Sequence, residues 1–393
     1  MSSSIKFTFA FLLVLAISAV TMAQSNTTGA IGGVITNPNK EVVPGAAVTV
    51  RNTETNKEDS ATSDDSGRFK IINLQPGNYS ISINASGFSA FTQDNVVVEI
   101  GRETSVEVPL SIGAVTGTVE VSADAPVINT TQQDFSTNLN QTSINELPVN
   151  GRRWSNFAIL TPGAVPDGNF GLISFRGISG LLNNSTVDGG DNNQAFFSEE
   201  RGRTRSAYSI SQSAIREFQV NTSNFAAEYG RSAGGVINAI TKSGTNEFHG
   251  SAFLYDRNNK WGARNPNTFI NKLVNGVSTR FALKPEDVRY QFGGTIGGPI
   301  VKDKLFFFFS YDQQRRNFPG VAVFSTPGYL NTVNRCASAT AAGCTTALFN
   351  ASLKNPVRNL TDAQIDSALN FINDQTGEVP RRGDQKLFLP KID

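Results

Sequence analysis

Short runs in which apolar and polar residues alternate recur along most of the chain, separated by clusters of glycine, proline, asparagine and aspartate. Alternation with a period of two predicts half-buried strands, and the clusters between them predict tight turns. In the first part of the chain, six such runs cover residues 30–37, 46–52, 67–74, 77–85, 95–100 and 104–110. Six or seven short strands between residues 28 and 112 predict a small β-sandwich, in which Gly45, Gly67 and Gly77 need positive φ at turns.

Residues 113–246 have a different pattern. A polar, extended stretch at residues 116–133 comes first, and Ser143 with Glu146 three residues later then has the spacing of a capping box at a helix start. Strands, one of them preceded by a short helix, are predicted at residues 173–180, 184–193, 211–230 and 233–246. This part of the chain is therefore a small α+β domain.

From residue 247 the strands become more widely spaced. They are predicted at residues 248–257, 290–301, 304–314 and 386–393. A tight polar turn at 302–304 joins the second to the third, whereas about thirty residues follow the first and about seventy follow the third. Short turns alternating with long loops are typical of a transmembrane β-barrel, which needs at least about eight strands to remove its edges. We therefore expect residues 247–393 to be the first strands of an incomplete barrel, with both long loops outside the cell.

The first 23 residues have the pattern of a secretory signal peptide. Lys6 precedes an apolar run at residues 7–20 that is too short to span a bilayer, and small residues surround a cleavage point after Ala23. Export to an oxidising compartment also bears on the state of the two cysteines. Cys336 and Cys344 lie close together, so in an oxidising compartment they predict a local disulfide that braces an external loop, with two free thiols as the alternative.

Composition and charge argue against several classes of protein. A net charge of +1 with only 17% charged residues gives no reason to expect a nucleic-acid partner. The one histidine, His249, has no nucleophile elbow or cysteine pattern to accompany it, and no zinc spacing is present. The acidic turn at residues 188–193 lacks the glycine position and distal glutamate of an EF-hand. We therefore expect no enzymatic activity, no cofactor and no bound metal.

The turn and strand pattern of residues 32–50 and 62–88 resembles the carboxypeptidase regulatory-like domain. The resemblance covers the whole of residues 28–112. It implies a transthyretin-like sandwich, which is related in fold to carbohydrate-binding modules and has no catalytic role.

Three motifs in the next segment occur in a fixed order: FRG at residues 175–177, VDG at 187–189 and GGVINAITKSG at 234–244. Together they resemble the plug domain of TonB-dependent outer-membrane receptors, which would occupy residues 113–246. The resemblance places four residues in the plug core: Arg176, Gly177, Asp188 and Gly189. A buried arginine needs carboxylate or carbonyl partners. These residues would either lock the structure or take part in the signal that loosens the plug.

The run TVEVSA ahead of this domain resembles a TonB box. Its residues are Thr118, Val119, Glu120, Val121, Ser122 and Ala123. The resemblance implies an extended, mobile segment, because the periplasmic energy-transducing protein of the TonB type pairs with it as an added strand. The alternative interpretation is an ordinary linker strand.

The order of these parts resembles the Oar-like TonB-dependent receptors. The resemblance implies a mainly β protein of the cell outer membrane, in which the sandwich is periplasmic. It also implies gated uptake of an external ligand whose identity the sequence does not give, with a carbohydrate and a peptide as candidates. Because only about four barrel strands are visible, we expect the chain to be the N-terminal fragment of a longer protein. The alternative is a secreted or surface carbohydrate-binding β-sandwich protein without transport.

Residues 305–311 are apolar or aromatic at every position except Ser310. A barrel strand with lipid outside and a plug inside would accept such a run. If Ser310 and Asp312 face the lumen, the period of two also points Phe306 and Phe308 inward. The residues expected to face outer-membrane lipid are then Leu305, Phe307, Phe309 and Tyr311.

Overall fold

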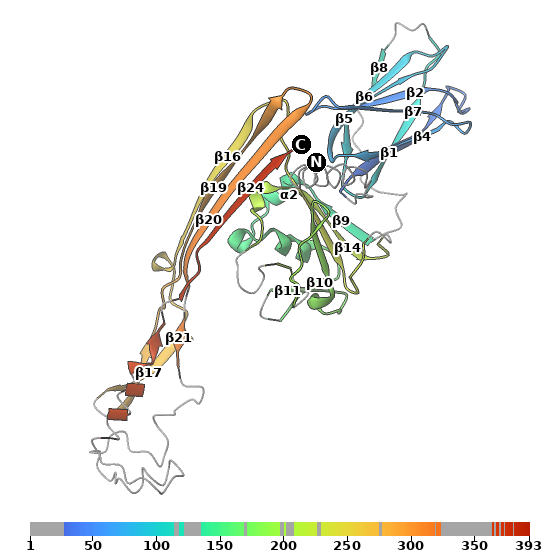
Figure 1. The fold of residues 1–393 in the computed structure, drawn as a ribbon. Coiled ribbons are helices and arrows are strands. Elements are labelled where there is room, and N and C mark those ends of the chain that lie inside the picture. The colour runs from blue at the N-terminus through green and yellow to red at the C-terminus, as the bar shows by residue number, and fades with distance from the viewer. Residues whose placement is uncertain are drawn as a thin grey trace, which may run out of the picture. The chain divides into compact units, whose positions relative to one another are not determined.

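A computed structural model shows the fold of the chain (Figure 1). It describes residues 27–113, 118–121, 135–168, 171–196, 200–201, 208–225, 229–274, 277–318, 320–323, 364, 367–368, 371–372, 374–379 and 381–393. The described residues of 27–251, 295–311 and 387–393 belong to one compact unit, and those of 252–294 and 312–386 belong to a second. The predicted signal peptide and both cysteines lie outside the described residues.

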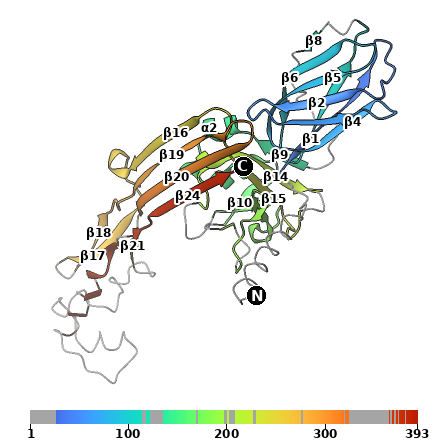
Figure 2. The same cartoon turned by 45° about the horizontal axis from the view of Figure 1, so that its top comes forward.

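The N-terminal strands form the predicted sandwich of two sheets, drawn in blue to cyan in Figures 1 and 2. A three-stranded sheet has the order β4-β1-β7, and a five-stranded sheet has the order β3-β2-β5-β6-β8. Their bounds are β1 Gly29–Thr36, β2 Ala47–Asn52, β3 Glu58–Thr62, β4 Arg68–Leu74, β5 Gly77–Asn84, β6 Ala90–Val98, β7 Glu103–Pro109 and β8 Thr118–Val121. Only β3 has no counterpart among the predicted runs, because its sequence, EDSAT, is mostly polar.

Alternation along the strands builds the core of the sandwich. On β5, Tyr79, Ile81 and Ile83 are buried while the residues between them are not. They pack with buried side chains of β1, β2 and β6, including Ile31, Val48 and Phe91. The turns behave as predicted at Gly45 and Gly67, which have φ of 72° and 68°, a region that glycine enters without the steric cost of a Cβ atom.

The plug-like domain, by which we mean the described residues of 135–241, contains a five-stranded sheet of order β13-β12-β15-β14-β9. Strands β12 and β15 are parallel, and the other pairs are antiparallel. Around the sheet lie the two-stranded ladder β10-β11 and several short helical turns. The bounds are β9 Phe135–Leu139, α2 Gln141–Glu146, η1 Asn150–Arg152, η2 Trp154–Leu160, β10 Ala164–Asp167, β11 Leu172–Phe175, η3 Gly180–Leu182, β12 Asn184–Val187, β13 Gly190–Asp191, η4 Gln212–Ala214, β14 Ile215–Ser223 and β15 Val236–Thr241.

Buried aromatic side chains pack against each other in the core of this domain. Trp154 and Phe218 meet edge to face with ring centroids 5.8 Å apart, and both side chains are fully buried. The predicted capping box is wrong. Ser143 lies inside helix α2, and its N–H donates to the side chain of Asn140, which is the N-cap. Asparagine at this position satisfies a first-turn N–H that has no partner within the helix, so no box is needed.

The predicted later strands are present and form an elongated sheet of order β16-β19-β20-β23, with β24 also pairing β20. Their bounds are β16 His249–Asn258, β19 Val288–Val301, β20 Leu305–Phe318, β23 Arg381–Arg382 and β24 Gln385–Ile392. The short elements between them are η5 Asn259–Trp261, β17 Phe269–Val274, β18 Val277–Ala282, β21 Val321–Ala322 and β22 Gly377–Glu378. The β17–β18 hairpin was not predicted, although the Asn-Gly pair between its two strands is a strong hairpin signal in the sequence.

Strand β20 carries the phenylalanine run, and its burial alternates as predicted. Phe306, Phe308, Ser310 and Asp312 share the buried face, with exposed fractions of 7%, 1%, 2% and 1%. Phe309 on the other face is 37% exposed. The two faces therefore differ in environment although aromatic rings occupy both.

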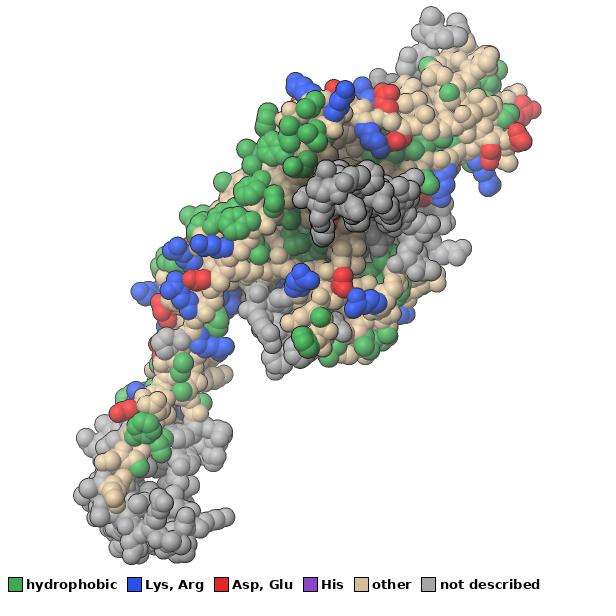
Figure 3. Space-filling model, viewed as in Figure 1, with side chains coloured by type: hydrophobic (Ala, Val, Ile, Leu, Met, Phe, Trp, Pro, Cys, Tyr) green, Lys and Arg blue, Asp and Glu red, His purple; other side chains and the backbone are tan. Residues whose placement is uncertain are grey.

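Hydrophobic side chains gather on the surface over the elongated sheet (Figure 3). In the first unit, the exposed members are Phe248, Ile296, Ile300, Val301, Phe309, Phe388 and Ile392. Contiguous apolar surface of this kind marks a contact with lipid or protein in native structures. Among the described residues, no helix is both long enough and apolar enough to cross a membrane.

Candidate functional site

The candidate TonB box contributes a strand to the sandwich. Its first four residues form β8, which runs parallel to the start of β6. The register pairs Ala90 with Thr118, Phe91 with Val119, Thr92 with Glu120 and Gln93 with Val121. The described part of the box, Thr118–Val121, is therefore extended, and it is also paired, which the sequence pattern did not indicate. Ser122 and Ala123 lie outside the described residues.

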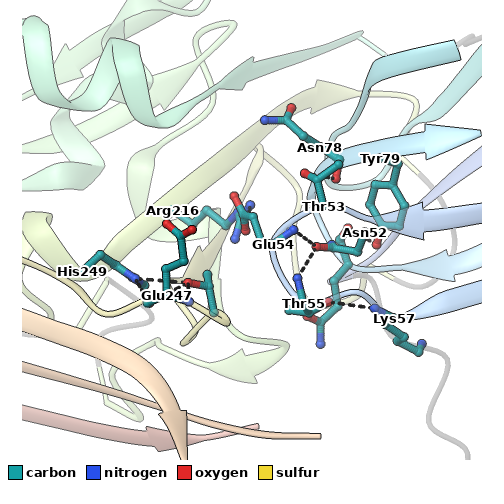
Figure 4. Close-up of polar contacts among 12 residues, drawn as sticks. Asn52, Thr53, Glu54, Thr55, Lys57, Asn78, Tyr79, Arg216, Glu247 and His249 are labelled. Atoms are coloured by element: carbon teal, nitrogen blue, oxygen red, sulfur yellow. Dashed lines mark hydrogen bonds and ion pairs between the residues drawn. The ribbon is translucent and has the colours of Figure 1, made fainter. Parts of the chain in front are cut away.

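The turn after β2 places a carboxylate against the plug-like domain. The buried side chain of Asn52 accepts hydrogen bonds from the backbone N–H groups of Glu54 and Thr55, at 2.9 and 3.1 Å. This local turn holds Glu54 so that its Oε2 lies 2.9 Å from a guanidinium nitrogen of Arg216, at the start of β14 (Figure 4). The backbone C=O of Glu54 also accepts from the N–H of Asn246 at 3.0 Å.

A second contact lies at the turn between β6 and β7. Both backbone groups of Ile100 are bonded to side chains of the plug-like domain. Its N–H donates to Oε1 of Glu217 at 2.5 Å, and its C=O accepts from the side-chain amides of Gln219 and Asn138, each at 3.2 Å. Because a buried peptide needs partners for both groups, this arrangement fixes the turn on strands β14 and β9.

Burial changes the acidity of two groups near these contacts. The pKa of Glu217 is raised to about 7, chiefly because burial disfavours the charged carboxylate, and the nearby Glu99 acts in the same direction. The N–H of Ile100 and the charges of Arg216 and Arg102 oppose this rise without cancelling it. The pKa of Lys242 is lowered to about 8, first by burial and then by the neighbouring Arg216 and Arg152.

The tight turn at residues 302–304 contacts the same region. Asp303 has φ of 62°, and its Oδ1 accepts from the side-chain amides of Asn56 at 2.9 Å and Asn246 at 2.8 Å. Its N–H donates to Oδ1 of Asn246 at 2.8 Å. Asn56 belongs to the turn that also carries Glu54. Polar contacts therefore connect the sandwich, Asn246 in the segment between β15 and β16, and the tight turn between β19 and β20.

None of the four expected plug-core residues is buried. Arg176 and Asp188 are exposed and have φ of 54° and 49°, and the glycine that follows each of them, Gly177 or Gly189, also has positive φ and is exposed. These residues were expected in a buried core, but they are exposed because both dipeptides form turns at the ends of strands β11 and β12. Asp188 still has a structural role, since its carboxylate accepts from the N–H and the hydroxyl of Thr241 at 2.8 and 2.6 Å.

His249 is the first residue of β16, and its Nδ1 lies 3.3 Å from the hydroxyl of Thr245. Within the described part of the chain, no group of three or more His, Cys, Asp and Glu side chains is close enough to hold a metal ion. The disulfide between Cys336 and Cys344 stays a prediction.

Sequence comparisons identify two domains. Residues 30–111 match the carboxypeptidase regulatory-like domain, and residues 240–375 match the outer membrane beta barrel domain. The second match fits the elongated sheet and its exposed apolar surface, and with the relative described next it places the protein in the cell outer membrane.

The chain is also similar to the TonB-dependent transporter Oar of Myxococcus xanthus, with 31% identity over 295 residues. This alignment covers 73% of the chain and 26% of the transporter, so the chain spans about a quarter of the length of that relative.

Two solved structures are similar over about half of the chain. The siderophore receptor PirA from Acinetobacter baumannii is 22% identical, covering 46% of the chain and 24% of PirA, with a TM-score of 0.34. The outer membrane transporter YddB from Escherichia coli is 16% identical, covering 47% of the chain and 27% of YddB, with a TM-score of 0.37. Both TM-scores are too low to support an argument. The two domain matches follow the predicted order of the sandwich and the barrel strands, and the chain is similar to a TonB-dependent transporter of the Oar type.

Proposed function

We propose that this chain forms the periplasmic and gating part of a receptor that imports an external ligand through a plugged barrel. The identity with a TonB-dependent transporter over nearly three quarters of the chain is the observation that carries the proposal. In this role the protein is a gated transporter rather than an enzyme. The ligand binds outside the cell, and an energy-transducing protein of the TonB type acts from the periplasm.

The segment Thr118–Ala123 is the part of the receptor to which the transducer binds. A partner that pairs by adding a strand needs an extended backbone, and the described residues of this segment have that conformation in β8. The segment also precedes β9, which is an edge strand of the plug-like sheet. Force applied to the segment therefore reaches the plug-like domain through its edge, where one neighbouring strand has to be released rather than two.

The tight turn at residues 302–304 faces the periplasm in this proposal. The hydrogen bond from Asn56 of the sandwich to Asp303 supports this orientation, because the sandwich follows the predicted signal peptide and stays on the periplasmic side. The long loops then face outward, which agrees with the general pattern of outer-membrane barrels.

The experiment is a replacement of residues 118–123 by a glycine-serine sequence of equal length in the receptor expressed in its own outer membrane. Cysteine cross-linking to the cell's energy-transducing protein should be lost, while the amount of receptor in the membrane stays unchanged. A matched pair of variants separates backbone pairing from side-chain recognition. Val119→Pro removes a backbone N–H and should abolish cross-linking, whereas Val119→Thr keeps the strand propensity and should retain it. Undiminished cross-linking in the replacement variant would contradict the assignment of this segment.

The alternative of a secreted carbohydrate-binding protein makes a different prediction. Such a protein would appear in the soluble fraction after cell lysis. The receptor should instead sediment with outer membranes and change its electrophoretic mobility on heating.

A further inference from the structure

Strand β8 ends the five-stranded sheet of the sandwich, and β6 is its only neighbour in the described structure. Four consecutive residues of the candidate box are in parallel register with Ala90–Gln93. Without β8, this stretch of β6 would be an open edge with free N–H and C=O groups, which is the kind of surface that recruits an added strand. Strand β6 of the sandwich therefore pairs with one edge of the segment that the transducer is proposed to bind.

A bend in β6 lies next to the stretch that pairs with β8. Along β5, the register with β6 shifts between Tyr79, which faces Val96, and Ile81, which faces Gln93. The shift places two residues of β6, Asp94 and Asn95, opposite one residue of β5, and Asn95 has φ of 60°, which bends the strand. The straight part of β6 thus stops just beyond Gln93, where β8 also ends. The bend therefore limits the straight edge of β6 that a parallel strand can use.

A transducer that adds a strand brings its own folded domain to about one strand spacing, roughly 4.8 Å, from the backbone of the box. On one side of the box, the sandwich already fills that space. We propose, on the basis of the proposed function, that β6 sequesters the box and that sandwich and transducer compete for it. The sandwich then acts as an autoinhibitory holder of the transducer-binding strand.

The pairing is suited to reversible release. Ordering four residues costs an amount of free energy similar to what about four backbone hydrogen bonds return in water, so neither state dominates strongly. We expect the paired and released forms to be populated within about tenfold of each other, which lowers the apparent transducer affinity by the fraction of box that is free. A covalent link between β6 and the box should therefore reduce the fraction of free box to zero.

The test is a disulfide between two positions that face each other in the register. Thr92→Cys and Glu120→Cys are introduced into the complete receptor with Cys336 and Cys344 replaced by serine. The matched control combines Thr92→Cys with Thr118→Cys, which is two residues out of register. The Cα atoms of the control pair would be about 8 Å apart, beyond the usual limit of about 7 Å for a disulfide. The probe is the soluble periplasmic domain of the cell's own energy-transducing protein.

The in-register pair should oxidise in the periplasm, and the control pair should not. Oxidised receptor should lose at least about tenfold in affinity for the probe, and a reductant should restore it. Equal oxidation of both pairs, or no oxidation of the in-register pair, would overturn the pairing. Equal affinity of the oxidised and reduced receptor would overturn the competition. A failure of the proposed function looks different, because the probe would then still bind the receptor whose residues 118–123 are replaced.

Discussion

The buried carboxyl of Glu217 provides a sharp test of the contact between the sandwich and the plug-like domain. Its side chain accepts the N–H of Ile100 across that contact, and the residue is 6% exposed. The charged groups around it are Glu99, Arg102 and Arg216. We consider Glu217→Gln, which keeps a hydrogen-bond acceptor for Ile100 and removes the ionisable proton.

The sign of the effect follows from the raised pKa. Glu217 titrates near its ordinary value of 4.5 in the unfolded chain and at about 7 in the folded chain. The folded state therefore binds more protons between these pH values, so this group's contribution to stability is present below pH 4.5 and is lost as pH rises through 7. A difference of this size corresponds to a few kcal/mol, on the order of 3, because one pKa unit is about 1.4 kcal/mol.

The assay is thermal unfolding of the purified receptor at pH 5 and pH 8. Hydrogen exchange of the backbone amides of β14 is then measured at the same two pH values. The variant should resemble the wild type at pH 5 and should be more stable at pH 8. The matched control is Glu58→Gln on exposed strand β3, which should change little at either pH. If Glu217→Gln lost stability between pH 5 and pH 8 as steeply as the wild type, the pH dependence would not come from this carboxyl and our account would be wrong.

Two further predictions concern the elongated sheet. A cysteine that replaces Phe307 should react with a lipid-soluble thiol reagent much faster than one that replaces Phe308, which is 1% exposed; equal labelling would contradict the alternation of β20. Gly244→Ala should destabilise the receptor by about 1–3 kcal/mol in a denaturation assay, because the new Cβ would lie under 3.0 Å from backbone atoms of the β19–β20 hairpin. Gly262→Ala is the control, since its Cβ would make only ordinary contact, and a similar loss there would refute the steric reasoning.

Local patterns were sufficient for most of the strands. Alternation found six of the seven strands between β1 and β7 and all the long strands of the elongated sheet, because side chains alternate across every strand wherever one face is buried. The pattern also assigned the faces of β20 correctly from two polar residues, Ser310 and Asp312. It failed at β3, whose polar sequence is held in place by its neighbour β2.

Local motifs were less informative about burial. The resemblance of FRG and VDG to plug motifs placed Arg176 and Asp188 in a core, yet both side chains are exposed at turns. A buried arginine would have needed carboxylate or carbonyl partners, but the backbone turn that follows each strand leaves these side chains exposed. Similarly, Ser143 had the spacing of a helix cap, while Asn140 was closer to the first turn and took that role.

The sequence by itself determined the order of the parts, the strands and the family resemblance, because these depend on spacing and periodicity within short segments. Only the tertiary structure decided that Glu217 is buried against Ile100, that Asp303 bonds to Asn56, and that β8 pairs with β6. Each of these contacts joins residues far apart in the chain. Their formation depends on how the domains fold and pack, which no local pattern encodes.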